Sequence, residues 1–242
     1  KICSIQIKQS RGTMINAVLK KKTEIRLNED TKTSSILGLM SLLPAELFWK
    51  LLKNSLSEPK NLPVSSGDLL NIEFWPHWYN NEKDTDITNS KLVEPDVYIE
   101  FENFNTIIEV KLDGNLQYEN QWINQICAYQ TNIKSSKPLV YIALGGNKSL
   151  ETNTLTKGKA QGYYIYNCSW KRLLEVIHEQ IDFLNSEPYK FDGQTLRILH
   201  RVEQAFSIYG ERVTLWMESI PTHLTAIDNN YIKEIRRLWR IK

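Results

Sequence analysis

Hydrophobic and polar residues alternate on both sides of a short polar turn in the stretch from residue 94 to residue 111. The apolar positions are β-branched or aromatic, and the turn falls at residues 103 to 105, Asn-Phe-Asn. Alternation with a period of two is typical of strands, so the pattern predicts a β-hairpin here. Side chains at i and i+2 of a strand share a face, so we expect Glu109 and Lys111 to project together while Val110 points into the core.

A segment rich in capping residues, residues 28 to 34, comes before an apolar pattern with helical spacing over residues 36 to 52. Ser, Thr, Asn and Asp in this position favour a helix that begins here. Pro44 falls within the pattern, and proline is favoured in the first turn of a helix but costly inside one. The pattern therefore predicts two helices divided near Pro44.

Patterns on both sides of the predicted hairpin indicate further helices and strands. Apolar residues at i, i+4 and i+7, namely Trp122, Ile126 and Tyr129, predict a helix over residues 116 to 133. The remaining predicted elements are a strand near residues 69–75, a continuous apolar strand over 138–144, a strand over 162–167 and a helix capped by Ser169.

The order strand, hairpin, helix, strand, strand, helix predicts an α/β fold with a central mixed β-sheet flanked by helices. Beyond Pro188 only helical patterns occur, at residues 194 to 209 and 231 to 242. We therefore expect one domain over 1–187 and a C-terminal helical extension over 188–242. The last helix carries Lys and Arg residues that could grip phosphates through counterion release, although a solvated helix face explains them equally.

Composition narrows the function classes only in part. The chain has 242 residues, 41% of them hydrophobic and 24% charged, which is ordinary for a soluble globular protein. Its net charge of +2 permits nucleic-acid binding only through local basic patches. The three cysteines form no CxxC pair, so we expect reduced thiols in a cytoplasmic protein and neither a zinc site nor a disulfide framework. No apolar run approaches the roughly twenty residues that span a bilayer, so we expect no membrane partner.

Two carboxylates and one ammonium are expected to meet at one end of the hairpin. Asp96 stands at the head of the first strand, where pairing brings it close to Glu109 and Lys111. Carboxylate oxygens are the hard ligands that Mg²⁺ prefers, and the ion usually takes only one or two of them. A bound ion lowers the pKa of a coordinated water, and Lys111 could orient that water or stabilise developing charge. The alternative is an acidic edge hairpin with Lys111 as a solvated charge.

Pro95-Asp96, twelve intervening residues and then Glu-Val-Lys at 109 to 111 resemble the motif of the PD-(D/E)XK nuclease superfamily, the restriction-endonuclease-like phosphodiesterases. The resemblance implies a restriction-endonuclease-like core and an endonuclease, most readily acting on DNA, that hydrolyses phosphodiester bonds with Mg²⁺ or Mn²⁺. RNA or a structured junction is the alternative substrate. The metal ligands that it implies are Asp96, Glu109, Val110 and Glu29. The catalytic residues that it implies are Asp96, Glu109, Lys111, Gln125 and Glu29.

Gln121, Gln125 and Tyr129 lie one turn apart on the predicted helix, on a face that looks back toward the hairpin. Gln125-Ile-Cys-Ala-Tyr129 is similar to the QxxxY motif of the RecB/Cas4 branch of the superfamily. In that branch the Gln and the Tyr help to position the metal site and the substrate backbone, so the resemblance implies these roles here, with Gln121 beside them. The chain lacks the four cysteines that hold an iron–sulfur cluster in some members, and no such cluster is expected.

Glu29 has two interpretations, which stay open at this point. An acid at the N-terminus of the predicted helix interacts favourably with the helix dipole and needs no active site. In many members of the superfamily, however, a Glu on the helix before the catalytic hairpin completes the metal site. The segment over residues 28 to 34 resembles that type of opening.

Aromatic residues are concentrated at residues 74 to 79, Phe-Trp-Pro-His-Trp-Tyr. Exposed rings stack on bases in proteins that bind single strands, whereas buried rings contribute much of the packing in protein cores. We expect packing over a loop or the edge of the core to be the main use of these rings.

Members of the superfamily occur often in anti-phage defence, mobile elements and DNA repair, and many cut both strands as dimers. The resemblance therefore implies a bacterial defence or DNA-processing role, with a homodimer or a defence-system protein as a partner beside the nucleic acid. The alternative function is a non-catalytic nucleic-acid-binding or assembly module on the same fold.

Overall fold

The computed structural model describes residues 18, 24–59, 61–80, 92–112, 114–147, 149, 151–156, 158–186 and 193–213. The chain divides into two compact units, Lys1–Arg212 and Val213–Lys242. The fold and the site described below belong to the first unit. The predicted basic helix over residues 231–242 lies outside the described residues.

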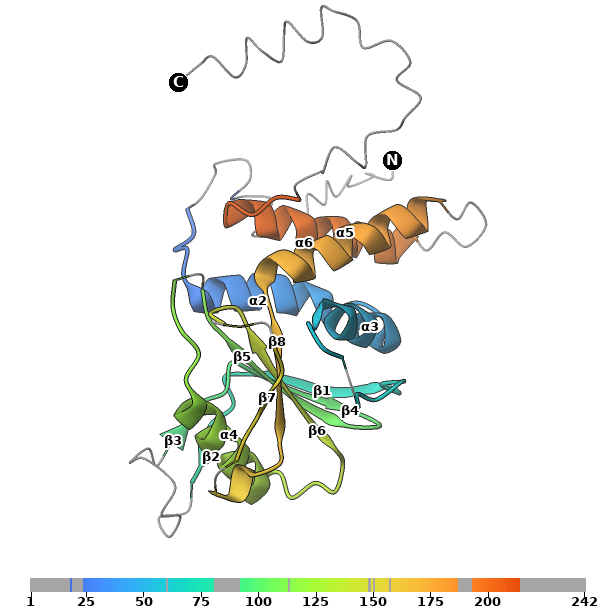
Figure 1. The fold of residues 1–242 in the computed structure, drawn as a ribbon. Helices are drawn as coiled ribbons and strands as arrows, with labels where there is room; N and C mark the ends of the chain where they lie inside the picture. The colour runs from blue at the N-terminus through green and yellow to red at the C-terminus, as the bar shows by residue number, and fades with distance from the viewer. Residues whose placement is uncertain are drawn as a thin grey trace, which may run out of the picture. The chain divides into compact units, whose positions relative to one another are not determined.

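The central sheet of the first unit has six strands: β1 (Leu69–Phe74), β4 (Val97–Phe101), β5 (Asn105–Val110), β6 (Leu139–Leu144), β7 (Asn153–Thr154) and β8 (Tyr164–Cys168). Their order is β1-β4-β5-β6-β8-β7 (Figure 1). β4 pairs antiparallel with both β1 and β5. The strands β5, β6 and β8 run parallel to one another, and β7 pairs antiparallel with β8. A separate two-stranded sheet consists of β2 (Trp78–Tyr79) and β3 (Leu92–Val93).

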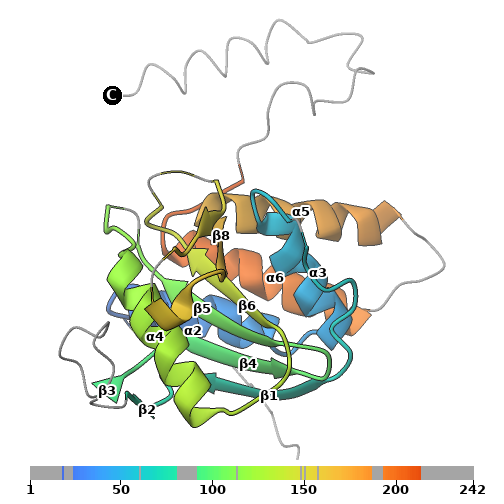
Figure 2. The ribbon, with the colours of Figure 1, turned by 60° about the horizontal axis from the view of Figure 1, so that its bottom comes forward.

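The helices that flank this sheet are α2 (Glu29–Met40), α3 (Ala45–Ser55), α4 (Glu119–Asn132), α5 (Trp170–Ser186) and α6 (Gly193–Ile208). Figures 1 and 2 show α4 on one face of the sheet and α2 and α3 on the other. α5 and α6 pack over α3 and α2 and against each other. The prediction of an α/β fold with a mixed sheet flanked by helices is therefore confirmed. Within the described ranges, no helix combines the length and the apolar character needed to cross a bilayer.

The local predictions around the site are confirmed. β4 and β5 form the expected hairpin, with Val97 opposite Ile108 and Glu100 opposite Asn105. α2 begins at Glu29, because Asn28 and Thr31 form a reciprocal capping box at its N-terminus. α3 begins directly after Pro44, so the long apolar pattern is divided where the proline predicts.

α4 begins at Glu119, three residues after the predicted start. The main-chain N–H of Gln117 donates to Gly146 O, 3.1 Å away, on the segment that follows β6. This bond ties residue 117 to the segment after β6, and the apolar periodicity contains no sign of it.

The expected boundary after residue 187 falls within the first unit, whose end is at Arg212. α6 belongs to this unit because its apolar stripe packs against α2 and α5. Phe206 of α6, for example, meets Trp170 of α5 edge-on, with ring centroids 6.0 Å apart. The division of the chain comes after α6 instead of before it.

Trp78 shows how the aromatic segment over residues 74–79 is used. Its side chain is 4% exposed, and its ring lies 5.4 Å from Tyr98 and 6.1 Å from Tyr129 between centroids. This ring packs in the core between the sheet and α4, as predicted. Tyr79 is 62% exposed.

Candidate functional site

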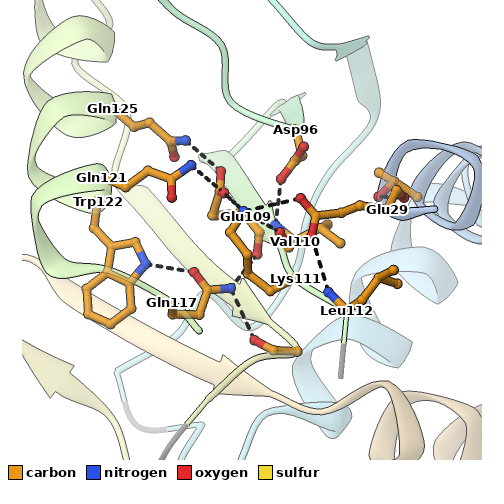
Figure 3. Close-up of polar contacts among 12 residues, drawn as sticks. Glu29, Asp96, Glu109, Val110, Lys111, Leu112, Gln117, Gln121, Trp122 and Gln125 are labelled. Carbon is orange, nitrogen blue, oxygen red and sulfur yellow. Dashed lines mark hydrogen bonds and ion pairs between the residues drawn. The ribbon is translucent and has the colours of Figure 1, made fainter. Parts of the chain in front are cut away.

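The hairpin brings Asp96 and Glu109 to the same end of the sheet. Asp96 lies directly before β4, and Glu109 lies near the end of β5. Asp96 Oδ2 accepts a hydrogen bond of 2.7 Å from the main-chain N–H of Val110. Among the described residues, Asp96 Oδ1 receives no hydrogen bond. One oxygen of Asp96 is thus tied to the residue after Glu109, and the other is available (Figure 3).

Glu109 is the centre of the polar contacts at this end. Its side chain is 1% exposed, and α4 and the end of β5 supply three donors to its carboxylate. Gln121 Nε2 lies 2.6 Å from Glu109 Oε1, Lys111 Nζ lies 2.5 Å from the same oxygen, and Gln125 Nε2 lies 2.6 Å from Oε2. Figure 3 shows both glutamines pointing from α4 to this carboxylate. The spacing of four residues on a helix places them one above the other.

Lys111 joins Glu109 to Glu29, which comes from the opposite side (Figure 3). Its Nζ lies 3.3 Å from Glu29 Oε1 and 2.8 Å from Val110 O. Glu29 Oε2 accepts a second bond, of 3.2 Å, from the main-chain N–H of Leu112. Glu29 therefore stands in the first turn of α2, as the first interpretation has it, and contacts Lys111 and Leu112; that it completes a metal site stays a prediction.

Val110 meets the site only through its main chain. Its side chain is fully buried and lies on the other face of β5 from Glu109 and Lys111, as the strand period predicts. Its carbonyl oxygen accepts the bond from Lys111 Nζ. A contribution of Val110 to a metal site would have to come from this oxygen.

Two site residues were missed by the sequence analysis, Gln117 and Tyr141. Gln117 Nε2 donates to Glu109 O at 3.2 Å and to Gly145 O at 3.1 Å, which ties the ends of β5 and β6 together. Its Oε1 accepts from Trp122 Nε1 at 3.0 Å. The available signal was a glutamine every fourth residue at 117, 121 and 125.

Tyr141 was hidden in the continuous apolar pattern of β6. Its side chain is fully buried, and its hydroxyl donates to Gln125 Oε1. This bond orients the amide so that Gln125 Nε2 faces Glu109 Oε2. A single hydroxyl within an otherwise apolar buried strand was the only signal in the sequence.

Tyr129 lies away from the site. Its hydroxyl accepts a 2.8 Å bond from Asn105 Nδ2 at the start of β5, whereas Glu109 is near the end of that strand. Its side chain is 3% exposed. The resemblance implies that this tyrosine helps to position the metal site and the substrate backbone, which stays a prediction; in the structure its hydroxyl joins α4 to β5.

Comparisons with known proteins add one relative. The chain is similar to Uncharacterized protein PM0110 of Pasteurella multocida (strain Pm70), with 28% identity over 209 residues, 79% of this chain and 74% of that protein. No family profile matches the chain, and no solved structure matches it. The name of this relative describes no activity, so the case for a function rests on the geometry of the site.

Burial and like charge dominate the electrostatics of the two central acids. Burial, together with the negative charge of Glu109, raises the pKa of Asp96 to about 8, although the Val110 N–H opposes the shift. Burial also raises the pKa of Glu109 despite the neighbouring Lys111 and Gln125. Burial alone would lower the pKa of Lys111, but Glu109 and the other acids raise it. Three carboxylates face one ammonium, so the site favours an additional positive charge.

The donors at this site suit Mg²⁺ or Mn²⁺ in number and type. In the part of the chain that the structure describes, no three His, Cys, Asp or Glu side chains are placed to hold a metal ion together. Mg²⁺ usually takes only one or two carboxylates and fills its other positions with water and substrate oxygens. Asp96, Glu109 and the Val110 carbonyl supply such a set, although Glu109 Oε1 and Val110 O also accept bonds from Lys111 Nζ; both oxygens of Glu29 are bonded, one to Lys111 and one to the Leu112 N–H.

Proposed function

We propose that this protein is a divalent-metal-dependent nuclease that hydrolyses phosphodiester bonds, with DNA as its substrate. The observation that carries the proposal is the meeting of Asp96, Glu109 and Lys111 at one end of a β-hairpin. Lys111 Nζ contacts Glu109 Oε1 at 2.5 Å, and Asp96 is bonded to the residue between them. Acids and a lysine in this arrangement match the chemistry that the PD-(D/E)XK resemblance implies.

Asp96, Glu109 and the main-chain oxygen of Val110 would hold the ion. The Glu29 carboxylate would remain on Lys111, where the structure has it. When bound, Mg²⁺ or Mn²⁺ supplies a Lewis acid that polarises the phosphoryl oxygen and lowers the pKa of a coordinated water.

Each protein side chain then has a definite task. Gln121 and Gln125 hold the Glu109 carboxylate in one orientation through 2.6 Å bonds to its two oxygens. Lys111, whose side chain is 14% exposed, is the cation able to orient the attacking water or to stabilise charge that develops on the phosphoryl group. Glu29 keeps the ammonium of Lys111 directed into the site. Preorganised groups of this kind cost no rearrangement at the moment of reaction.

DNA is proposed from the superfamily resemblance, and so is a role in bacterial defence or DNA processing. The site recognises a phosphodiester, and the surrounding segments select the polymer. The test must therefore offer plasmid DNA, single- and double-stranded oligonucleotides, and RNA.

The experiment compares cleavage by the full chain with Mg²⁺, with Mn²⁺ and with a chelator. We expect cleavage that depends on the metal, and a fall of about 10²-fold or more in Glu109→Gln and Lys111→Ala. Lys137→Ala is the matched control, because Lys137 forms a 2.9 Å ion pair with Glu100 elsewhere on the hairpin. Its cleavage rate should equal that of the wild type.

Cleavage that survives in both site variants would contradict the proposed site. Tight binding of DNA without turnover under either metal would favour the non-catalytic binding module instead.

A further inference from the structure

The main chain of Lys111 is held on both sides. Its N–H donates to Leu144 O at 2.9 Å, which extends the pairing of β5 with β6 beyond the last strand residue. Its carbonyl oxygen accepts a 2.9 Å bond from Trp170 Nε1, at the start of α5. These two bonds orient the peptide groups on either side of the Cα from which the Lys111 side chain leaves.

Gly145 makes the approach of the indole possible. Its φ is +76°, and a Cβ at this position would overlap Lys111 O and lie 2.8 Å from Trp170 Nε1. Only glycine fits both the left-handed backbone and the narrow space beside this bond. The segment after β6 is therefore shaped around the contact between Trp170 and Lys111.

Trp170 is itself fixed from two other directions. Its side chain is 1% exposed, and Phe206 packs edge-on against it. Lys32 Nζ lies 4.3 Å from the centroid of the Trp170 ring. Lys32 is 3% exposed and forms an ion pair with Glu211, near the end of the first unit. A buried ammonium needs such a partner, and it is attracted to the face of an indole.

We propose that Trp170 is a positioning residue for Lys111, and that the Lys32–Glu211 pair keeps the indole in place. The proposal rests on the proposed function, in which Lys111 acts at the phosphodiester. Trp170 acts through the Lys111 carbonyl oxygen. We assign it no contact with the reacting atoms. Loss of its N–H would let the Lys111 main chain relax and move Nζ from its place between Glu109 and Glu29.

Trp49 offers a matched control for this role. It is also 1% exposed, and its Nε1 also donates to a main-chain carbonyl, Pro63 O, at 3.0 Å. Its ring packs on Phe104, with centroids 4.6 Å apart, and among the described residues no hydrogen bond or ring contact joins it to a site residue. Trp49→Phe and Trp170→Phe therefore remove the same type of bond from equally buried positions, but only the second bond holds Lys111.

The first experiment measures kcat and KM of both variants in the full chain, with oligonucleotide DNA and saturating Mg²⁺. We expect Trp170→Phe to lower kcat about tenfold and to leave KM within about twofold, because displacement of a catalytic group affects the chemical step. Trp49→Phe should keep the wild-type kcat, while its thermal midpoint of unfolding falls about as far as that of Trp170→Phe. An equal change of kcat in the two variants would overturn the proposal.

The second experiment is independent of activity. Lys111 is labelled with acetic anhydride in the metal-free full chain, and its labelling rate is followed by mass spectrometry with Lys137 as the internal reference. Trp170→Phe should raise the rate at Lys111 several-fold, and Trp49→Phe should not. Equal rates at Lys111 in the two variants would overturn the proposal even if the wild type cleaves DNA. A wild type that cleaves nothing would remove the proposed function, while the labelling would still decide the role of Trp170.

Glu211→Gln supplies a milder variant in case Trp170→Phe does not fold. It removes the charge that pairs with Lys32 but retains the indole and its N–H. As in Trp170→Phe, we expect kcat to fall and the labelling rate of Lys111 to rise, each by about two- to threefold. Values equal to those of the wild type in both measurements would overturn the part assigned to the Lys32–Glu211 pair.

Discussion

The two ends of β5 are both joined to α4 by polar side chains, but they differ in charge. At the start of the strand, Asn105 donates to the Tyr129 hydroxyl, and both groups are neutral and buried. At the other end, the buried Glu109 carboxylate receives bonds from Gln121, Gln125 and Lys111. A neutral hydrogen-bonded pair costs little to bury, whereas buried charge is costly unless it is compensated. The charged end is therefore where function is proposed.

The largest effect should come from removal of both glutamine donors. Gln121→Leu combined with Gln125→Leu leaves the Glu109 carboxylate buried with Lys111 as the one remaining donor described here. We expect cleavage to fall about 10²-fold and the free energy of unfolding to fall by about 1 to 3 kcal/mol for each lost donor. Cleavage assays and urea titrations measure the two quantities.

Gln130→Leu is the control for this pair, because Gln130 is an exposed residue of the same helix that bonds Tyr163 outside the site. If Gln130→Leu reduced cleavage as much as the double variant, the proposal that the two bonds to Glu109 matter for cleavage would be contradicted.

The second prediction concerns pH. Asp96 has an ordinary pKa of 3.8 and a folded-state pKa of about 8, so the folded protein binds this proton more tightly than the unfolded chain does. Its contribution to the stability of the metal-free protein is complete below about pH 4 and is lost as the pH rises toward 8. Asp96→Asn should remove this loss, so that the variant becomes more stable than the wild type by a few kcal/mol at pH 8.

Chemical denaturation with a chelator present, at several pH values from 4 to 9, measures the difference between the two proteins. A constant difference over this range would contradict the assigned burial of Asp96. At the neutral end of the strand, Asn105→Ser should produce no such pH dependence, since it removes no ionisable group.

A smaller effect is expected at Tyr141, because it acts on Glu109 through Gln125. Tyr141→Phe removes the hydroxyl that orients the Gln125 amide and should lower cleavage about tenfold. Tyr98→Phe is the control, since the Tyr98 hydroxyl is buried on the same face of the sheet without a hydrogen-bond partner in the described structure. Cleavage rates that fall equally in both variants would show that the hydroxyl bond to Gln125 is unimportant.

The smallest effect belongs to the neutral end of β5. Tyr129→Phe removes the acceptor of the Asn105 amide and should cost about 1 kcal/mol of unfolding free energy. Cleavage should stay at the wild-type rate, because the lost bond lies at the other end of the strand from Glu109. A large loss of cleavage here would favour the positioning role that the QxxxY resemblance implies for this tyrosine.

Short-range patterns were sufficient for the longer strands and the flanking helices and for the centre of the site, but they did not predict the two-residue strands β2, β3 and β7. The two-residue period of a strand placed Glu109 and Lys111 on one face and Val110 on the other. The capping residues near Asn28 and the proline at 44 located the starts of α2 and α3. The four-residue spacing of Gln121 and Gln125 directed both side chains to one carboxylate. Each of these features depends on residues within about one helical turn or two strand positions. The local sequence is therefore enough to predict them.

Tertiary structure decided the contacts between segments that are distant in the chain. Gln117 meets Gly145 O and thereby joins β5 to β6 before α4 begins, Tyr141 of β6 orients Gln125, and Trp170 of α5 holds Lys111. The spacing of the glutamines singles out Gln117 but not its partner Gly145, and no pattern names the partners of Tyr141 or Trp170, because each bond depends on the packing of two elements against each other. The sequence determined which groups carry the chemistry proposed here. Only the packing of α2, α4 and α5 around the end of the hairpin determined how those groups are held.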